Sequence, residues 1–273
     1  MPTAPDIQAL YDLEPNLYDR LAGDRDFPAE VVAIRRMSGK SSTPEEAQQE
    51  RILELFAGPA WHSACWKHQF KAEVVAVDSS PGMRDLAVSR KRLDFNEYIV
   101  GRLPSVLASR NPKITFGSFD IALILRYSSG YLSGVELLEL ISLTSRLIKV
   151  GGYIVLELHD PRMLASDLER LPIRKRTFAM QDGSSLSCKW PSGPIRWLQP
   201  SKLVEMPVVI EHTTRDGRVR QLRYVSREYV YRLDDIQDMI KQISTLRLDQ
   251  RQISAVDCFK HSHLISFFRT SGR

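Results

Sequence analysis

The segments ILELFAGPAWHS at residues 52–63 and VVAVDSSPGM at residues 74–83 decide the fold of this chain. Each begins as a short apolar run, which predicts a buried strand, and each then passes through a turn into a helix. The first strand ends at the Gly58-Pro59 turn, and the second ends at Asp78, twenty residues beyond Gly58. A small-residue turn lets a ligand approach the backbone, and an acid after the next strand can accept hydrogen bonds from both hydroxyls of a ribose. The pattern predicts a binding site for a nucleoside-bearing cofactor.

The composition of the first turn favours one such cofactor over another. The pyrophosphate of NAD needs the glycines of a G-x-G-x-x-G turn, whereas residues 56–60 contain a single glycine, Gly58. S-adenosylmethionine has no phosphates for the turn to hold. Its methionine tail would lie near Glu54, which would be a direct or water-linked partner of the amino group. We therefore expect S-adenosylmethionine rather than NAD.

Outward from these segments, the chain alternates strand with helix up to about residue 160. Apolar runs at residues 119–125 and 153–158 predict two more buried strands, and a weaker run at residues 98–100 predicts another. Apolar residues at helical spacing over 137–148 predict a helix that Gly151-Gly152 stops. Continuous apolar strands separated by helices are typical of a parallel sheet covered on both faces.

Further along, the pattern changes to that of antiparallel strands. Alternating runs at residues 203–206 and 219–225 lie among turn signals such as Asp182-Gly183 and Asp216-Gly217. A helix is predicted at residues 233–243, and final strands at 246–248 and 264–268. The predicted parts are a helical lead-in or cap over residues 1–50, an α/β domain over residues 51–171 and 233–273, and an inserted antiparallel β subdomain over residues 172–232.

Composition and charge argue against several classes of protein. Of the 273 residues, 43% are hydrophobic and 26% charged, as in ordinary globular proteins, and no apolar run approaches the ~18 residues that suggest a membrane span. The net charge is +5, but basic and acidic residues are interleaved, so we expect no nucleic-acid partner. Three scattered cysteines have neither disulfide nor metal-ligand spacing, and nothing completes a metal site around His261 and His263. We expect a cytoplasmic protein without a metal, whose partner is a small molecule, and a homodimer is left open.

Four stretches of the chain resemble the class I S-adenosylmethionine-dependent methyltransferases. More narrowly, they resemble the small-molecule N-methyltransferase branch that includes glycine N-methyltransferase and aminosugar N,N-dimethyltransferases. The stretches are Tyr18-Asp19, ILELFAGPAWHS, VVAVDSSPGM, and the pair FDIALILRYSSGYL with LIKVGGYIVLELHDP. The resemblance implies a Rossmann-like, seven-stranded, mostly parallel sheet in the order 3-2-1-4-5 with a terminal antiparallel hairpin, and a β lid over the substrate. It also implies methyl transfer to an amine of a small polar metabolite, or less readily to a hydroxyl or carboxylate.

The resemblance further assigns cofactor contacts to particular positions. These are Glu54 and Gly58 at the methionine end, Tyr18 closing over that end, Asp78 on the ribose, Met83 on the adenine, and Arg126 between cofactor and acceptor. Two features depart from the family pattern. Phe56 and Ala60 stand at usual glycine positions, and residues 100–103 supply no acid after the third strand.

The predicted catalytic residues are Tyr127 and His159, which follow or end two core strands. Methyl transfer depends mainly on placing the nucleophile in line with the methyl group. Because the acceptor must be unprotonated when it attacks, a nearby base helps. His159, Glu157 and His62 are the alternatives for this base, and a mechanism without one is equally open.

The insert and the degenerate turn leave other functions open. We predict that an acidic or aromatic acceptor is bound by Arg196, Tyr224 and Arg227. The alternative is that these three residues belong to an ordinary amphipathic sheet. One rival function is an enzyme of this fold that uses the cofactor in a reaction other than methylation. Another is a scaffold without cofactor, in which Phe56 and Trp61 would fill the cleft. A nucleic-acid methyltransferase is a third, and it requires a contiguous basic face.

Overall fold

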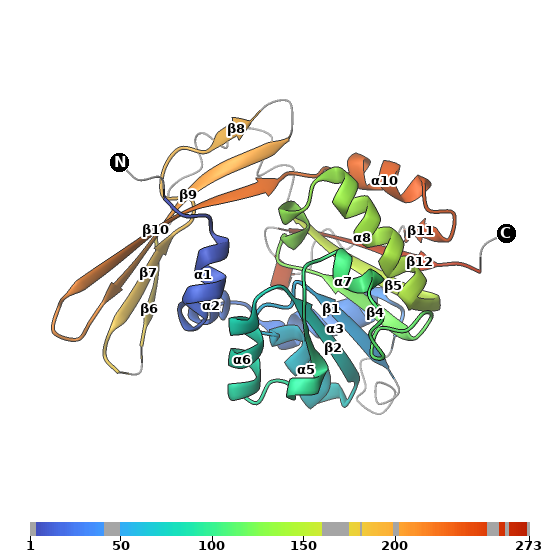
Figure 1. The fold of residues 1–273 in the computed structure, drawn as a ribbon, viewed down its shortest axis with the longest axis horizontal. Helices are drawn as coiled ribbons and strands as arrows, with labels where there is room; N and C mark the ends of the chain where they lie inside the picture. The colour runs from blue at the N-terminus through green and yellow to red at the C-terminus, as the bar shows by residue number, and fades with distance from the viewer. Residues whose placement is uncertain are drawn as a thin grey trace. The chain divides into compact units, whose positions relative to one another are not determined.

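The structure, a computed structural model, describes residues 4–40, 50–159, 175–180, 182–198, 202–249, 257–259 and 262–271. The chain divides into two compact units (Figure 1): Met1–Asp24 with Pro161–Val230, and Arg25–Asp160 with Tyr231–Arg273. The sequence placed boundaries at residues 50, 171 and 232, so the predicted lead-in is shared between the two units. Within the described residues, no helix is both long and apolar enough to cross a membrane.

The larger unit is built on a seven-stranded sheet in the order β3-β2-β1-β4-β5-β12-β11. The first five of these strands are parallel, whereas β12 is antiparallel to both β5 and β11. The predicted order 3-2-1-4-5 with a terminal antiparallel pair is therefore confirmed. The strands are β1 (Arg51–Leu55), β2 (Glu73–Asp78), β3 (Tyr98–Val100), β4 (Phe119–Ile124), β5 (Ile148–His159), β11 (Leu246–Leu248) and β12 (Ser262–Arg269).

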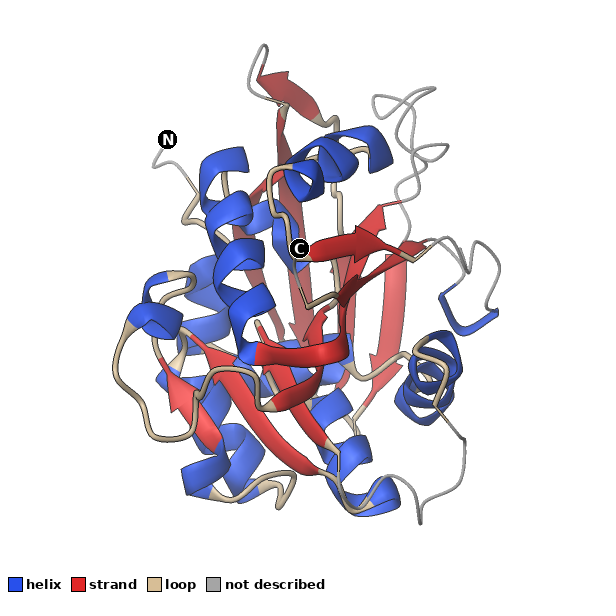
Figure 2. Ribbon diagram, turned by 90° about the vertical axis from the view of Figure 1, so that its right-hand side faces the viewer, coloured by secondary structure: helices blue, strands red, loops and turns tan. Residues whose placement is uncertain are grey.

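Helices flank the parallel strands on either side (Figure 2). The helix α3 packs against α5, and α7 packs against α8. The helix α6 begins at a serine cap followed by a proline, and Ser80 Oγ accepts a hydrogen bond from the Met83 N–H at 3.3 Å. The helices are α3 (Phe27–Met37), α5 (Trp61–Phe70), α6 (Pro81–Ser89), α7 (Ser105–Ala108), α8 (Gly134–Leu147) and α10 (Leu233–Lys241), with short 3₁₀ turns η1 (Phe95–Glu97), η2 (Ser128–Tyr131) and η4 (Asp257–Phe259).

One predicted boundary in this unit is wrong. The helix expected to run to Gly151-Gly152 ends at Leu147, and Ile148 already begins β5. Gly151 has φ 80°, and a Cβ on Gly152 would lie 2.9 Å from the Asp120 carbonyl oxygen. These glycines therefore serve an irregular stretch of strand, where the pairing of β4 with β5 shifts register. Helical periodicity alone could not separate the two cases.

The smaller unit contains an antiparallel sheet in the order β10-β9-β7-β6, with β8 paired to β9. The turn signals are confirmed at Gly183 and Gly217, whose φ angles of 81° and 84° lie in the left-handed region. Placement of this sheet as a lid over the substrate stays a prediction. The elements are α1 (Gln8–Leu13), α2 (Pro15–Ala22), β6 (Lys175–Ala179), β7 (Ser185–Lys189), β8 (Arg196–Leu198), β9 (Leu203–Thr213) and β10 (Val219–Tyr229).

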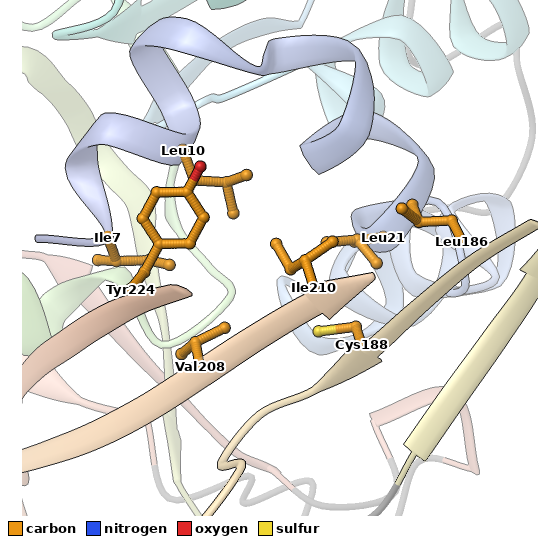
Figure 3. Packing of buried hydrophobic residues seen from close by; sticks show 8 residues of the cluster. All are labelled: Ile7, Leu10, Leu21, Leu186, Cys188, Val208, Ile210 and Tyr224. Atoms are coloured by element: carbon orange, nitrogen blue, oxygen red, sulfur yellow. The ribbon is translucent and has the colours of Figure 1, made fainter. Parts of the chain in front are cut away.

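The two N-terminal helices belong to this unit because they cover one face of its sheet (Figure 3). Alternate residues of β9, such as Val208 and Ile210, are buried against them, as the period of two in a strand requires. The cluster consists of Ile7, Leu10 and Leu21 from the N-terminal segment and Leu186, Cys188, Val208, Ile210 and Tyr224 from the sheet.

Candidate functional site

The turn after β1 keeps a glycine-type backbone although only one of its residues is the expected glycine. Phe56, Gly58 and Ala60 have φ angles of 55°, 50° and 58°. An L-residue in this left-handed region costs roughly 1–2 kcal/mol, so the surroundings must hold Phe56 and Ala60 in place. The turn therefore has, at three positions, the left-handed backbone that glycine adopts readily, although only Gly58 of the three is a glycine.

Asp78, at the end of β2, fixes this turn from the neighbouring strand. Its Oδ2 accepts a hydrogen bond from the Gly58 N–H at 2.8 Å, and its Oδ1 accepts one from the Ser80 N–H at 2.9 Å. The half-buried carboxylate therefore joins the turn after β1 to the start of α6. Asp78 and Gly58, which the sequence predicts to form one site, lie next to each other.

Two further side chains hold the carbonyl groups of the turn. Tyr98 of β3 donates its hydroxyl to the Gly58 carbonyl at 2.6 Å, and Arg92 Nη1 donates to the Pro59 carbonyl at 3.0 Å. The Arg92 guanidinium also lies 3.5 Å from the centroid of the Trp61 ring. This indole is stacked on Phe27 at 5.2 Å with an interplanar angle of 5°.

Behind the turn, a histidine lies between two glutamates. His62 Nδ1 is 3.2 Å from Glu54 Oε1, and His62 Nε2 is 2.7 Å from Glu30 Oε2. Burial alone would lower the pKa of His62, but the hydrogen bonds and charges of the two glutamates outweigh it and raise the pKa above its ordinary value. The other oxygen of Glu54 accepts from Ser63 N at 2.9 Å and Ser63 Oγ at 2.5 Å, which caps α5.

Arg25 connects this group of charged side chains to Glu157 of β5. Its guanidinium pairs with Glu30, and its Nη1 donates to Glu157 of β5 at 2.9 and 3.1 Å. Glu157 also accepts from the backbone N–H of Arg126 at 2.7 Å and from Ser262 Oγ at 2.5 Å. Burial opposes ionisation of Glu157, but the Arg25 charge and these hydrogen bonds hold its pKa below the ordinary value. Arg25 Nη2 is buried and has no partner among the described residues.

The two predicted catalytic residues lie face to face. The rings of Tyr127 and His159 are stacked with centroids 3.9 Å apart and an interplanar angle of 4°. Tyr127 Oη is 2.8 Å from Ser262 Oγ. Burial and the nearby Glu157 carboxylate raise the pKa of Tyr127, so it is a neutral phenol at physiological pH.

The remaining predicted cofactor residues occupy defined places, and their contacts to a cofactor stay predictions. Met83 lies in the first turn of α6 and is 1% exposed. The backbone of Arg126 has φ 60°, and its N–H donates a hydrogen bond to Glu157. Tyr18 lies on α2 in the smaller unit, where its ring meets that of Tyr11 edge-on at 4.6 Å.

The predicted substrate residues of the insert are engaged within their own unit. Arg196 pairs with Glu205 at 2.8 Å, and Arg227 pairs with the same glutamate at 3.0 Å from the opposite neighbouring strand. Tyr224 is 6% exposed and belongs to the core cluster of Figure 3. These contacts are those of an amphipathic sheet, and substrate binding by the three residues stays a prediction.

The residues of the site that were not predicted from the sequence include Arg25, Glu30 and Ser262, and also Tyr98 and Arg92, which hold the turn after β1. Arg25 and Glu157 are 132 residues apart, and Ser262 and Glu157 are 105 apart, so no local spacing connects them. The one local signal is the start of α3, where Asp26 caps the helix by accepting from the Ala29 N–H at 3.1 Å. No group of three or more potential metal ligands occurs within the part of the chain that is described, and His261 lies outside it.

Comparisons with family models and with curated proteins do not assign this chain to a family. No family model matches the chain. Among curated proteins, the glycine–tRNA ligase beta subunit of Myxococcus xanthus is 35% identical over 72 residues, which are 26% of this chain and 10% of that protein. The match is too short to show a family for the chain.

Solved structures match over nearly the whole chain. DesVI of Streptomyces venezuelae has a TM-score of 0.71 at 15% identity, covering 93% of this chain and 98% of that one. An S-adenosylmethionine-dependent methyltransferase of Clostridium acetobutylicum has a TM-score of 0.65 at 16% identity, covering 94% and 97%. The glycopeptide N-methyltransferase MtfA, complexed with S-adenosylmethionine, has a TM-score of 0.51 at 14% identity, covering 90% and 95%. The chain has the methyltransferase fold. The predicted fold class is confirmed.

Proposed function

We propose that the larger unit binds S-adenosylmethionine and that the protein transfers the methyl group to an amine nitrogen of a small polar metabolite. The observation that carries this proposal is the turn at residues 56–60, held in left-handed geometry by Asp78 at the end of the next strand. In sheets of this topology, ligands bind at the carboxyl ends of the strands where the strand order reverses. That point lies between β1 and β4, directly beside the turn.

The residues at this edge fit the chemical groups of the cofactor. The Asp78 carboxylate suits the ribose hydroxyls, and the turn backbone gives close access to the methionine end. Arg25 Nη2 is a buried donor without a described partner, and a carboxylate such as that of methionine would satisfy it. The cofactor would supply an activated methyl group, so the protein's task is to bind and orient the acceptor.

The hydrogen bonds and charges around His62 and Glu157 reduce the number of candidates for the general base that would deprotonate the acceptor. His62 is enclosed by two carboxylates that raise its pKa and favour its protonated form, so it is a poor proton acceptor. Glu157 accepts hydrogen bonds from Arg25, Arg126 and Ser262, and its pKa is lowered, so it is a poor proton acceptor. His159 is the remaining candidate, and a mechanism in which water takes the proton is the alternative.

An amine acceptor is supported by two independent considerations. MtfA, a neighbour in fold, is an N-methyltransferase. At the Tyr127 hydroxyl the charge of Glu157 also acts more strongly than the opposing charge of its ion-pair partner Arg25, and this disfavours an anionic acceptor at that point, because like charges repel strongly in a low-dielectric site. The acceptor is therefore proposed to be an amine rather than a carboxylate.

The test is S-adenosylmethionine binding by calorimetry to wild type and Asp78→Asn. We expect a micromolar interaction, on the order of −8 kcal/mol, weakened roughly tenfold or more by the substitution, because hydrogen bonds to a charged group contribute about 1.5–3 kcal/mol. Asp216→Asn is the matched control, since Asp216 is a surface turn residue of the smaller unit. Circular dichroism must show that both variants are folded, because Asp78 also supports the turn.

The outcomes separate the rival functions. Binding followed by S-adenosylhomocysteine formation with an amine panel supports the proposal. Binding without that product under any acceptor favours an enzyme that uses the cofactor for another reaction. Absence of binding to folded wild-type protein refutes the proposal and favours a scaffold.

A further inference from the structure

The hydrogen bonds around Glu157 have a defined direction. Its two oxygens accept from Arg25 Nη1, the Arg126 N–H and Ser262 Oγ, and each of these groups is a donor. An ionised carboxylate can only accept. The single hydroxyl proton of Ser262 is therefore directed at Glu157, over a distance of 2.5 Å.

This direction determines the role of the next group. Ser262 Oγ is also 2.8 Å from Tyr127 Oη, and Ser262 has no second proton to give. The phenolic proton of Tyr127 must then be donated to Ser262. Any further partner of the Tyr127 oxygen has to be a donor, because the only phenolic proton is already engaged.

The Tyr127 side chain is also held in place. Its ring stacks on His159, and its backbone has φ 60° next to Arg126, whose N–H is bound by Glu157. The same carboxylate therefore orients the backbone before Tyr127 and, through Ser262, the hydroxyl at its tip. Two strand ends, those of β4 and β5, are joined at this point.

We propose that the chain Tyr127–Ser262–Glu157 makes Tyr127 a hydrogen-bond acceptor toward the substrate, so that the site selects an acceptor nitrogen that still carries an N–H. The inference rests on the proposed function and deepens it. Primary and secondary amines can donate to Tyr127 while the nitrogen lone pair faces the methyl group. Tertiary amines and carboxylates cannot donate, and methylation is expected to stop at the tertiary amine.

The reaction balances without another reactant. The nitrogen lone pair forms the new N–CH₃ bond while the S–CH₃ bond breaks and its electron pair returns to sulfur. The methylated nitrogen then releases one proton to His159 or water. Tyr127 keeps its own proton throughout, in agreement with its raised pKa. Its part is to orient the acceptor, and Ser262 is a positioning residue that acts through it.

The closing experiment combines a spectroscopic readout with an acceptor series. Protein labelled with ¹³C at tyrosine Cζ reports hydrogen bonding of each phenol by NMR, and Tyr127→Phe assigns the signal among the nine tyrosines. Ser262→Ala should move the Tyr127 signal, because the phenol loses the group to which it donates. Ser266→Ala is the matched control: Ser266 lies on the same strand, is 2% exposed, and its hydroxyl has no partner among the described residues.

The acceptor series uses one scaffold carrying a primary, secondary or tertiary amine or a carboxylate, with kcat/KM for each. Wild type and Ser266→Ala should prefer the N–H-bearing amines. Ser262→Ala should lose roughly tenfold of that preference, which corresponds to about one hydrogen bond, because Tyr127 is then able to donate.

An unmoved Tyr127 signal in Ser262→Ala overturns the proposed direction of the chain. A moved signal with unchanged acceptor preference overturns the selectivity. Failure of wild type to bind S-adenosylmethionine in the calorimetry described above refutes the proposed function and this inference with it, so the two failures are distinguishable.

Discussion

The stability of the larger unit should fall as pH rises, because two carboxylates raise the pKa of the buried His62 and stabilise its cationic form. Burial alone would lower the pKa of His62, but Glu30 and Glu54 outweigh this effect and raise it above the ordinary value of 6.5. A group whose pKa is raised on folding contributes stability that is fully present below its unfolded pKa. That contribution is lost as pH rises through the folded value. The window therefore begins near pH 6.5 and extends upward.

The perturbation that removes this dependence is His62→Gln. Glutamine can still hydrogen bond, but it leaves Glu30 and Glu54 buried without the cation between them. Loss of one partner of a buried charge pair costs about 3–5 kcal/mol, a large part of the ~5–15 kcal/mol stability of a typical protein. We expect the variant to be folded but much less stable, and to lack the fall in stability above pH 6.5 that wild type shows.

Urea unfolding at several pH values between about 6 and 9 measures both effects. The control is His68→Gln, because His68 lies on the same helix and its Nε2 lies 3.1 Å from the carbonyl oxygens of Lys91 and Arg92 rather than between two carboxylates. It should follow the wild-type pH profile. Equal pH profiles for wild type and His62→Gln would show that His62 is not the titrating group, and the electrostatic argument for the network would fail.

Two further changes test the packing of each unit. Lys71→Gly should stabilise the larger unit by up to about 1 kcal/mol in urea unfolding. The reason is that Lys71, the residue after the last turn of α5, has φ 58°, a left-handed conformation that glycine adopts without strain. Lys71→Ala keeps that strain and should show no comparable gain. Leu186→Ala should destabilise the smaller unit by about 2–5 kcal/mol in thermal or urea unfolding, because Leu186 is fully buried in the cluster of Figure 3. Leu13→Ala, at a side chain 77% exposed, should change it by less than about 0.5 kcal/mol, and equal losses would contradict the packing described.

The parts of the site that sequence could predict are those encoded locally. The apolar runs before Gly58 and Asp78 indicate strands, and their spacing brings two neighbouring strand ends together, as the 2.8 Å hydrogen bond between these residues confirms. Tyr127 and His159 follow the same logic, since Tyr127 comes shortly after the end of β4 and His159 ends β5. The strand order itself came from the resemblance, because periodicity does not specify which strands are neighbours.

The rest depends on contacts between residues that are distant in sequence. Glu54 was expected beside the cofactor's amino group, yet its hydrogen bonds to His62 and Ser63 come from the helix that follows, and Glu30 completes the group from another helix. Arg25 precedes the cap of α3 and shows no pattern that marks it as a partner of Glu157. Such networks are specified by tertiary packing, which cannot be predicted from the spacing of residues along the sequence.

The degenerate turn shows why a lost glycine pattern is weak evidence for a lost site. Left-handed backbone at Phe56 and Ala60 costs roughly 2–4 kcal/mol together. Hydrogen bonds contribute about 1 kcal/mol each, or about 1.5–3 when one partner is charged, and the turn receives such bonds from Asp78, Tyr98 and Arg92. Because Asp78 and Arg92 are charged, the three bonds together contribute about 4–7 kcal/mol, which is enough to offset the strain. Residues outside the turn therefore stabilise a conformation that glycine would adopt unaided. A ligand can approach this backbone although the turn lacks the glycine pattern by which such sites are usually recognised in a sequence.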